Sequence, residues 1–134
     1  MKSRRRKALA VIFAVFLTGC AAKTSDSEKS EEVYRQISME EAQEMMGEEE
    51  CVILDVRTKE EYDSGHIPGA ICIPNETIGD EEIPELPDKD QKILVYCRSG
   101  NRSKQAAKKL VQLGYTNVIE FGGIHDWQGE IVTD

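Results

Sequence analysis

The chain has 134 residues, with 17 Lys and Arg against 25 Asp and Glu, so its formal net charge is −8. Only 40% of the residues are hydrophobic and 31% are charged, a composition that excludes a protein with many membrane spans. The acidic balance argues against a nucleic-acid-binding protein, and the length is sufficient for one domain with one core.

The N-terminal residues 1–19 combine a basic cluster with a short apolar run. Five Lys or Arg lie within the first seven residues, and ten apolar residues follow at positions 8–17. Ten residues are too few to cross a hydrocarbon core of ~30 Å, so this pattern indicates a signal peptide and not a stable membrane span. The run ends in Leu17-Thr18-Gly19-Cys20, which resembles a bacterial lipobox.

The lipobox resemblance implies that cleavage leaves Cys20 as a lipid-carrying N-terminus. The alternative is ordinary signal cleavage, with Cys20 there by chance. Residues 20–36 are polar and poor in bulky apolar side chains, so we expect them to form a disordered tether. The expected location is the bacterial cell membrane, with the domain held by its lipid on the extracytoplasmic face or in a periplasm.

Residues 37–132 alternate between patterns typical of helices and strands. Ser38 with Glu41, and Thr58 with Glu61, have capping-box spacing, which predicts helices to about residue 46 and to residue 64. Short apolar runs predict four strands at 51–56, 70–73, 93–96 and 117–121. A further helix is predicted at 103–113, and the acidic stretch 80–90 is expected to be a surface loop with helical fragments. This order predicts a single α/β domain with a mainly parallel central sheet flanked by helices.

The polar loop 97–102 lies between a predicted strand and a predicted helix. In open α/β sheets, active sites lie beyond the carboxyl ends of the strands, which is where this loop falls. Backbone N–H groups around Gly100 can form an anion-binding nest, and the following helix directs the positive end of its dipole to the same place. Arg98 and Arg102 add positive charge. All of these features favour a nucleophilic thiolate at Cys97.

The distribution of charge agrees with an anionic substrate. Residues 91–119 contain six basic residues and no acid, although the chain as a whole is acidic. A positive region around a cysteine suits an anionic substrate or intermediate. Lys104, Lys108 and Lys109 are more simply interpreted as a solvated helix face, whereas Arg98 and Arg102, inside the loop, are interpreted as functional.

Three segments together resemble the rhodanese family of sulfurtransferases: LDVRTKEEYDSGHIPGAICIP (54–74), VYCRSGNRS (95–103) and FGGIHDWQGE (121–130). The resemblance covers nearly all of residues 37–132. It implies a rhodanese-like fold whose loop cysteine takes a sulfane sulfur from an anionic donor such as thiosulfate. The sulfur would be held as a persulfide and passed to a thiol or cyanide acceptor, with no cofactor.

The resemblance also implies a role for each loop residue. Cys97 would be the nucleophile and would carry the persulfide. Arg98 and Arg102 would attract and hold the anionic donor. The backbone amides would bind the persulfide and the departing anion; they belong to Arg98, Ser99, Gly100, Asn101 and Arg102.

Two other functions remain open. The cysteine phosphatases need an Arg after five intervening residues, which is position 103, but this position is Ser and Arg102 comes one residue too soon. The short loop therefore disfavours a phosphatase or arsenate reductase on the same fold. The second alternative is a catalytically silent binding or sensing module, which the presence of Cys97 disfavours because inactive family members typically lack this cysteine.

The remaining distinctive residues are given structural roles. Asp55 and Arg57 are expected to form an ion-paired or hydrogen-bonded scaffold at a strand end, because a buried Asp needs a partner. His66 is expected to stabilise a turn, and Trp127 to pack in the core or at its rim.

The other cysteines and the histidines give no sign of a metal site. Cys51 and Cys72 lie in apolar strand patterns and are expected to be buried and unreactive, although an extracytoplasmic location would allow a disulfide between them. With two His and no CxxC or HExxH spacing, we expect no metal.

Overall fold

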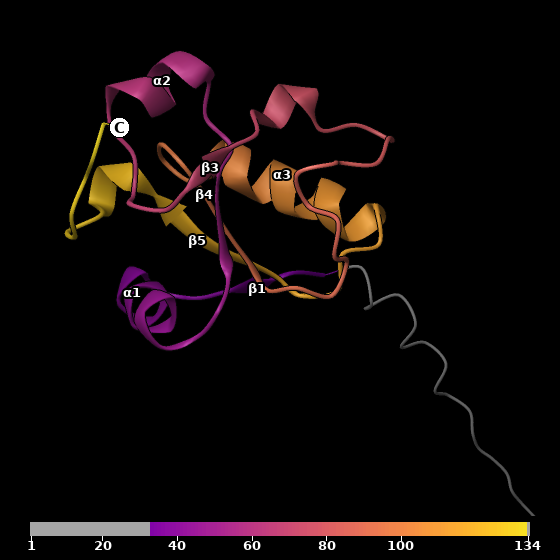
Figure 1. Cartoon of the computed structure of the whole chain (residues 1–134), viewed down its shortest axis with the longest axis horizontal. Coiled ribbons are helices and arrows are strands. Elements are labelled where there is room, and N and C mark those ends of the chain that lie inside the picture. Colours follow the sequence, from indigo (N-terminus) through magenta and orange to yellow (C-terminus); the bar gives the residue numbers. More distant parts are fainter. Residues whose placement is uncertain (1–32, 134) are drawn as a thin grey trace, which may run out of the picture. The chain divides into compact units, whose positions relative to one another are not determined.

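A computed structural model describes residues 33–133 of the chain (Figure 1). The predicted α/β architecture with a mainly parallel sheet is confirmed. Its elements, in chain order, are β1 (Arg35–Gln36), α1 (Met39–Glu48), β2 (Val52–Asp55), α2 (Lys59–Ser64), β3 (Ile71–Cys72), the 3-10 helix η3 (Asn75–Thr77), β4 (Ile93–Cys97), α3 (Asn101–Gln112), β5 (Val118–Gly123) and the 3-10 helix η4 (Ile124–Asp126).

The five strands form one sheet in the order β1-β5-β4-β2-β3, and every neighbouring pair is parallel. β4 is the central strand, and all five of its residues are buried. Such a run of apolar residues is typical of a parallel strand covered on both faces. Because the strands are parallel, their carboxyl ends meet at one edge of the sheet, where β4 ends at Cys97.

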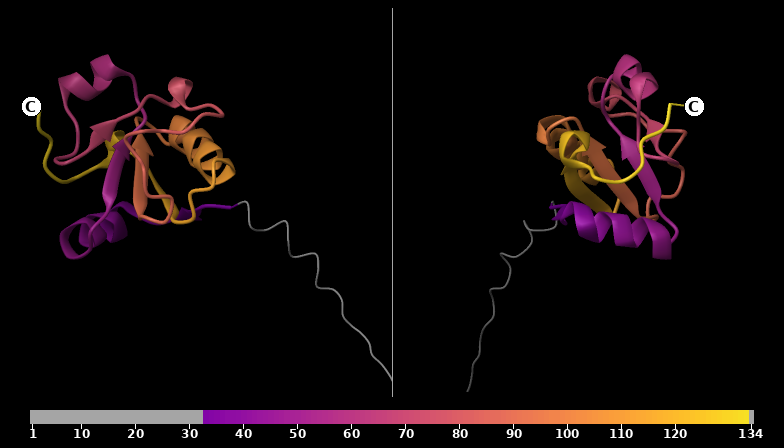
Figure 2. Two further views of the ribbon diagram at one scale, coloured as in Figure 1. Left: turned by 45° about the vertical axis from the view of Figure 1, so that its right-hand side comes forward. Right: turned by 90° about the vertical axis from the view of Figure 1, so that its left-hand side faces the viewer.

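Two apolar clusters cover the two faces of the sheet. On one face, side chains of β2 and β4 pack against α3 and the segment that follows β3, and Leu54, Val95 and Leu110 are fully buried there. On the other face, Leu94, Tyr96 and Ile119 pack against α1 and the segment around Ile67. Figures 1 and 2 show α3 and α1 on opposite sides of the sheet.

The first two helices begin where the capping boxes predict. The Ser38 hydroxyl accepts the Glu41 N–H at 3.1 Å, and the Ser38 N–H donates to the Glu41 carboxylate at 3.0 Å. Thr58 and Glu61 repeat this exchange at the start of α2. Gly65 ends α2 with φ 152°, a conformation that other residues rarely adopt.

The structure corrects several expected boundaries. Arg35 and Gln36, predicted to lie in a disordered tether, form β1 and pair with β5. The tether prediction is therefore wrong for these two residues, and its part before residue 33 lies outside the described residues. α3 begins at Asn101, two residues before the predicted start, because Gly100 adopts a left-handed conformation and allows the chain to turn into the helix at once.

The acidic loop also differs from its prediction. No helical fragment is present within residues 80–90, and η3 lies before them. The loop is nevertheless not only a surface feature, because Ile83 and Leu86 are buried in the core under it. Their apolar side chains hold the loop against the sheet, and a Leu86 N–H to Ile83 carbonyl bond of 2.9 Å closes a turn between them.

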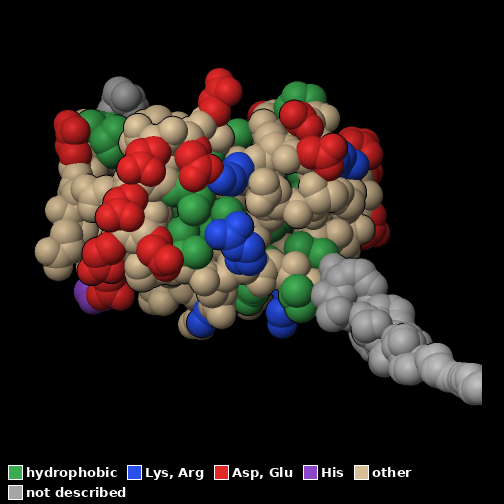
Figure 3. All heavy atoms as spheres, turned by 90° about the horizontal axis from the view of Figure 1, so that it is seen from below, with side chains coloured by type: hydrophobic (Ala, Val, Ile, Leu, Met, Phe, Trp, Pro, Cys, Tyr) green, Lys and Arg blue, Asp and Glu red, His purple; other side chains and the backbone are tan. Residues whose placement is uncertain are grey.

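The described surface is acidic on the side of α1. Figure 3 views the molecule from below Figure 1 and shows Asp and Glu side chains gathered over one part of that face. The exposed acids of α1 include Glu40, Glu41, Glu44 and Glu48. Each helix within residues 33–133 is too short or too polar to cross a bilayer. The predicted signal peptide and Cys20 lie outside the described residues.

Candidate active site

Cys97 lies at the carboxyl end of the central strand, and its side chain faces its own loop. The residue is 1% exposed. Its sulfur accepts the Gly100 N–H at 3.0 Å, and the Ser103 hydroxyl oxygen lies 3.5 Å from it. The sulfur is thus placed between the strand end and the first turn of α3, where amide donors and the helix dipole favour negative charge.

Glycines allow the loop to approach β5 closely. At Gly123 an added Cβ would lie 2.1 Å from the Arg98 carbonyl oxygen and 2.6 Å from the Ser99 Cα, so no other residue fits there without moving the loop. The Arg98 carbonyl also accepts the His125 N–H at 3.1 Å. The loop backbone is therefore fixed by β5 and η4 as well as by its own ends.

The two loop arginines have different environments. Arg102 donates to both Glu61 carboxylate oxygens, at 2.9 and 3.2 Å, and the hydrogen bond to Arg102 holds the pKa of Glu61 at about 2. The same pair raises the pKa of Arg102. Arg98 is exposed. Glu61 therefore occupies the Arg102 guanidinium that is predicted to hold the anionic sulfur donor. From the sequence, Glu61 is assigned only a role in capping α2.

Two further polar residues next to the cysteine were not recognised from the sequence. The Ser103 hydroxyl lies 2.5 Å from a carboxylate oxygen of Glu120, which is 2% exposed on β5. The only sign in the sequence was an acid inside the apolar run of a predicted strand. Because position 120 lies on a different strand from Cys97, its closeness to the loop depends on the order of strands in the sheet.

Asp55 and Arg57 form the expected ion pair at the end of β2. Arg57 donates to both Asp55 oxygens, with its shortest bond 2.7 Å, and also to the Gly65 carbonyl at 2.7 Å. Tyr96 donates to Asp55 at 2.6 Å, and burial and this hydrogen bond raise the pKa of the Tyr96 phenol. The group joins β2, β4 and the end of α2, so its contacts are those of a scaffold.

The other predicted structural residues have contacts of the expected kind. His66 is buried, its Nδ1 lies 2.8 Å from the Tyr62 carbonyl, and its ring stacks on Tyr62. The Trp127 ring packs near Phe121, and its Nε1 donates to the Glu130 carbonyl.

Cys51 and Cys72 are less buried than predicted. Both are free thiols and only half-buried: Cys51 lies just before β2, and Cys72 is the last residue of β3. Burial, followed by the charge of Asp55, raises the pKa of Cys72 to about 11, which keeps this thiol protonated near neutral pH. Burial also raises the pKa of Cys51.

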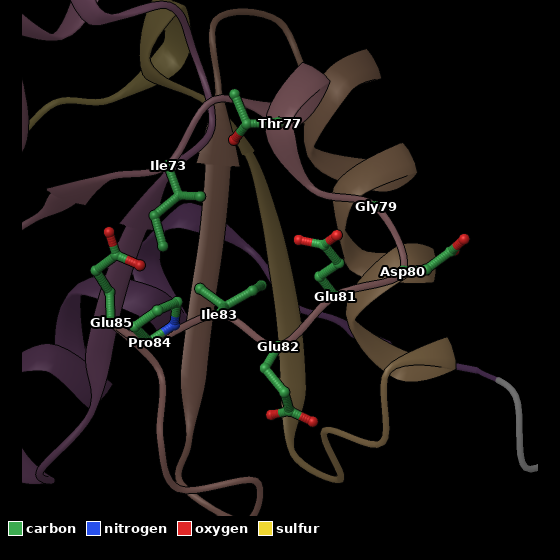
Figure 4. Close-up of a pocket in the computed structure, with 9 residues that line it drawn as sticks. All are labelled: Ile73, Thr77, Gly79, Asp80, Glu81, Glu82, Ile83, Pro84 and Glu85. Carbon is green, nitrogen blue, oxygen red and sulfur yellow. The ribbon is translucent and has the colours of Figure 1, made fainter.

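A surface hollow of about 400 Å³ lies along the acidic loop and not at the cysteine. Figure 4 shows the carboxylates of Asp80, Glu81, Glu82 and Glu85 around it. Such a lining repels anions, so this hollow does not suit the anionic ligand that the Cys97 loop favours. Within residues 33–133 no cluster of three His, Cys, Asp or Glu side chains is placed to hold a metal ion.

Comparison with known proteins gives consistent results. A family model described as "Rhodanese-like domain" matches residues 38–130. The thiosulfate sulfurtransferase PspE of Escherichia coli is 40% identical over 73 residues, covering 54% of this chain and 70% of that protein. The thiosulfate sulfurtransferase GlpE of Coxiella burnetii is 35% identical over 97 residues, covering 72% and 89%.

Solved structures agree with the fold. A rhodanese-related protein from Thermoplasma volcanium has a TM-score of 0.64 at 33% identity and covers 75% of this chain and 100% of its own. A rhodanese with anions from E. coli has a TM-score of 0.58 at 35% identity, covering 63% of this chain and 100% of its own.

Proposed function

Because the chain belongs to the family of rhodanese-like domains, we propose that it moves a sulfane sulfur from an anionic, thiosulfate-like donor to a thiol or cyanide acceptor through a persulfide on Cys97. The observation that carries this proposal is the position of the Cys97 sulfur. It lies at the end of the central strand, faces its own loop and accepts the Gly100 N–H at 3.0 Å.

The first half of the reaction loads the cysteine. The Cys97 thiolate attacks the outer sulfur of the donor, and a new S–S bond forms. The S–S bond of the donor breaks, and its electron pair leaves with sulfite. The Gly100 N–H points at the Cys97 sulfur, and the N-terminal end of α3 lies next to it. Both groups favour negative charge there, so they stabilise the persulfide anion.

The second half regenerates the enzyme. An acceptor thiolate or cyanide attacks the outer sulfur of the persulfide, and the bond between the two sulfurs breaks with its electron pair returning to Cys97. No redox partner or cofactor is required. The exposed Arg98 guanidinium attracts anionic donors to the loop, and Arg102 stays held by Glu61 until a donor competes for it.

The six-residue span from Cys97 to Arg102 favours sulfur chemistry over phosphate chemistry. A phosphatase would use a guanidinium that clamps the phosphate in two hydrogen bonds. Here the Arg102 guanidinium makes its two hydrogen bonds to Glu61 instead. The intact cysteine argues equally against a silent binding module.

The proposal is tested by incubating the purified protein with thiosulfate and cyanide. We expect thiocyanate to form, and we expect the Cys97→Ser variant to form none. After thiosulfate alone, mass spectrometry should detect one added sulfur on the peptide that contains Cys97. Hydrolysis of a small aryl phosphate without thiocyanate formation would contradict the proposal, as would an unmodified Cys97 after treatment with several sulfane donors.

We further propose that the chain is anchored to the outer face of the bacterial cytoplasmic membrane, or in a periplasm, by lipid on Cys20. The support is the basic cluster, the apolar run and the lipobox-like residues 17–20. Expression of the full chain in a bacterium should place it in the membrane fraction, and Cys20→Ser should release it to the soluble fraction. A Cys20→Ser variant that stays membrane-bound would contradict the lipid anchor.

A further inference from the structure

A buried carboxylate lies one side chain away from the Cys97 sulfur. Glu120 is 2% exposed, and among the described residues it forms no ion pair with a Lys, Arg or His. Its hydrogen-bond donors are the Ser103 hydroxyl at 2.5 Å, the Gly122 N–H at 3.0 Å and the Gln36 side chain at 3.1 Å. The carboxylate is therefore held in one place, with one of its oxygens against the Ser103 hydroxyl.

Ser103 connects this carboxylate to the thiol. Its hydroxyl oxygen lies 3.5 Å from the Cys97 sulfur and 2.5 Å from Glu120. A hydroxyl has one proton. While Ser103 donates that proton to a charged Glu120, it can only accept from the Cys97 thiol. If Glu120 is protonated instead, it donates to Ser103, and the Ser103 proton is free to point at a thiolate.

We propose that Glu120, acting through Ser103, receives the proton of the Cys97 thiol and so holds the sulfur in its nucleophilic form. The S–H bond breaks and its proton moves to the Ser103 oxygen, while the Ser103 proton moves to Glu120. The negative charge moves from the carboxylate to the sulfur, and no proton leaves the buried site. Glu120 is a positioning residue in this scheme, since it does not touch the donor.

Among the described residues, two titratable side chains interact with the ends of the path from Cys97 to Glu120. Arg102, on α3, lies close enough to Cys97 for their charges to interact. Tyr34 lies near Glu120, and burial, followed by the charge of that carboxylate, raises the pKa of the Tyr34 phenol. Cys97 belongs to a buried apolar cluster that includes Val56 and Ala106. The path from the thiol through Ser103 to Glu120 is therefore short and starts at the edge of the apolar core.

The inference rests on the proposed function for its purpose, but its test needs no sulfur donor. Alkylation of Cys97 by iodoacetamide is followed by mass spectrometry as a function of pH, with Cys51 and Cys72 as internal references. In Glu120→Gln, which keeps the shape of the side chain, we expect the alkylation rate near about pH 6.5 to fall ~10-fold and to recover at high pH, a shift of about one pH unit.

The opposite result is physically reasonable and would overturn the inference. If Glu120 acts only as a nearby negative charge, its removal favours the thiolate, and Glu120→Gln then alkylates faster at low pH. An unchanged pH profile would overturn it as well. Ser103→Ala, which interrupts the path, should shift the profile in the same direction as Glu120→Gln, and this variant decides the question if Glu120→Gln does not fold.

Gln36→Ala is the matched control. It removes the other side-chain hydrogen bond to Glu120 and leaves Ser103 in place. Because a hydrogen-bond donor favours the charged carboxylate, its loss favours proton uptake by Glu120, so the alkylation rate near about pH 6.5 should not fall. A fall as large as that of Glu120→Gln would assign the effect to packing of β1 and overturn the inference. A parent chain that forms no thiocyanate, while the variants show the expected alkylation profiles, would contradict the sulfur-transfer proposal alone.

Discussion

Replacing Gly123 by Ala should damage the active-site loop through a single methyl group. Gly123 has extended backbone, with φ −127°, so alanine meets no conformational strain there. The added Cβ would lie 2.1 Å from the Arg98 carbonyl oxygen and 2.4 Å from the Arg98 carbonyl carbon. Since a carbon and an oxygen in contact are normally about 3.3 Å apart, the loop must retreat by about 1 Å.

A shift of this size moves the hydrogen-bond donors of the loop, such as the Gly100 N–H, away from the Cys97 sulfur. A misplacement of ~1 Å can lower a catalytic rate by ~100-fold, and overpacking of this kind destabilises a fold by about 1–3 kcal/mol. We therefore expect Gly123→Ala to lose about two orders of magnitude in thiocyanate formation while it remains folded, because native domains are stable by about 5–15 kcal/mol. Initial rates and urea denaturation measure the two effects separately.

Gly47→Ala is the matched control for the same substitution. A Cβ at Gly47 meets nothing within 4 Å, and the residue lies in α1, so alanine should leave the rate unchanged and stabilise the helix by about 0.5–1 kcal/mol. A Gly123→Ala variant with the rate and stability of the parent chain would refute the close packing of the loop on β5.

Three further substitutions test other parts of the structure. Glu61→Gln should remove the contribution of the Glu61–Arg102 ion pair to the free energy of unfolding. The pair lowers the pKa of Glu61 to about 2. It therefore stabilises the fold above pH 4.5, the usual pKa of Glu, and this stabilisation is lost as the pH falls towards 2. The difference in free energy of unfolding between parent and variant should shrink by about 1 kcal/mol across that range, since the pair is partly exposed, and parallel pH profiles would contradict this. Asp55→Asn leaves the buried Arg57 guanidinium without its counter-charge and should cost about 3–5 kcal/mol in urea denaturation; a loss below about 1 kcal/mol would show that the pair is not structural. Leu110→Ala, at a fully buried position of α3, should cost about 2–5 kcal/mol, whereas a neutral result would contradict the packing of α3 on the sheet.

Local patterns in the sequence were enough to predict most of the sheet and its helices. The apolar run at 93–96 predicted the central strand, and the structure extends it by one residue, to Cys97. The capping-box pairs predicted where α1 and α2 begin, because a cap depends on residues three apart in the chain. The position of the Cys97 loop between a strand and a helix followed from the same local signals.

β1 has only two residues and no sequence pattern of its own, so local signals do not predict it. Arg35 and Gln36 are extended because β5 is there to pair with them, at a distance of 84 residues along the chain. α3 begins two residues before its predicted start. The left-handed conformation of Gly100, which lies close to Gly122 of β5, is not visible in composition.

The amino-acid sequence by itself determined the class of fold, the position of Cys97 in a loop between a strand and a helix, and the positive charge in that loop. Apolar periodicity, caps and a loop of given length are properties of neighbouring residues. Only the tertiary structure decided which acids reach that loop. Glu61 meets Arg102 across 41 residues, and Glu120 meets Ser103 across 17. Such contacts depend on strand order and on the faces to which side chains point, and a buried polar group takes whichever partner the packed fold brings within hydrogen-bond distance.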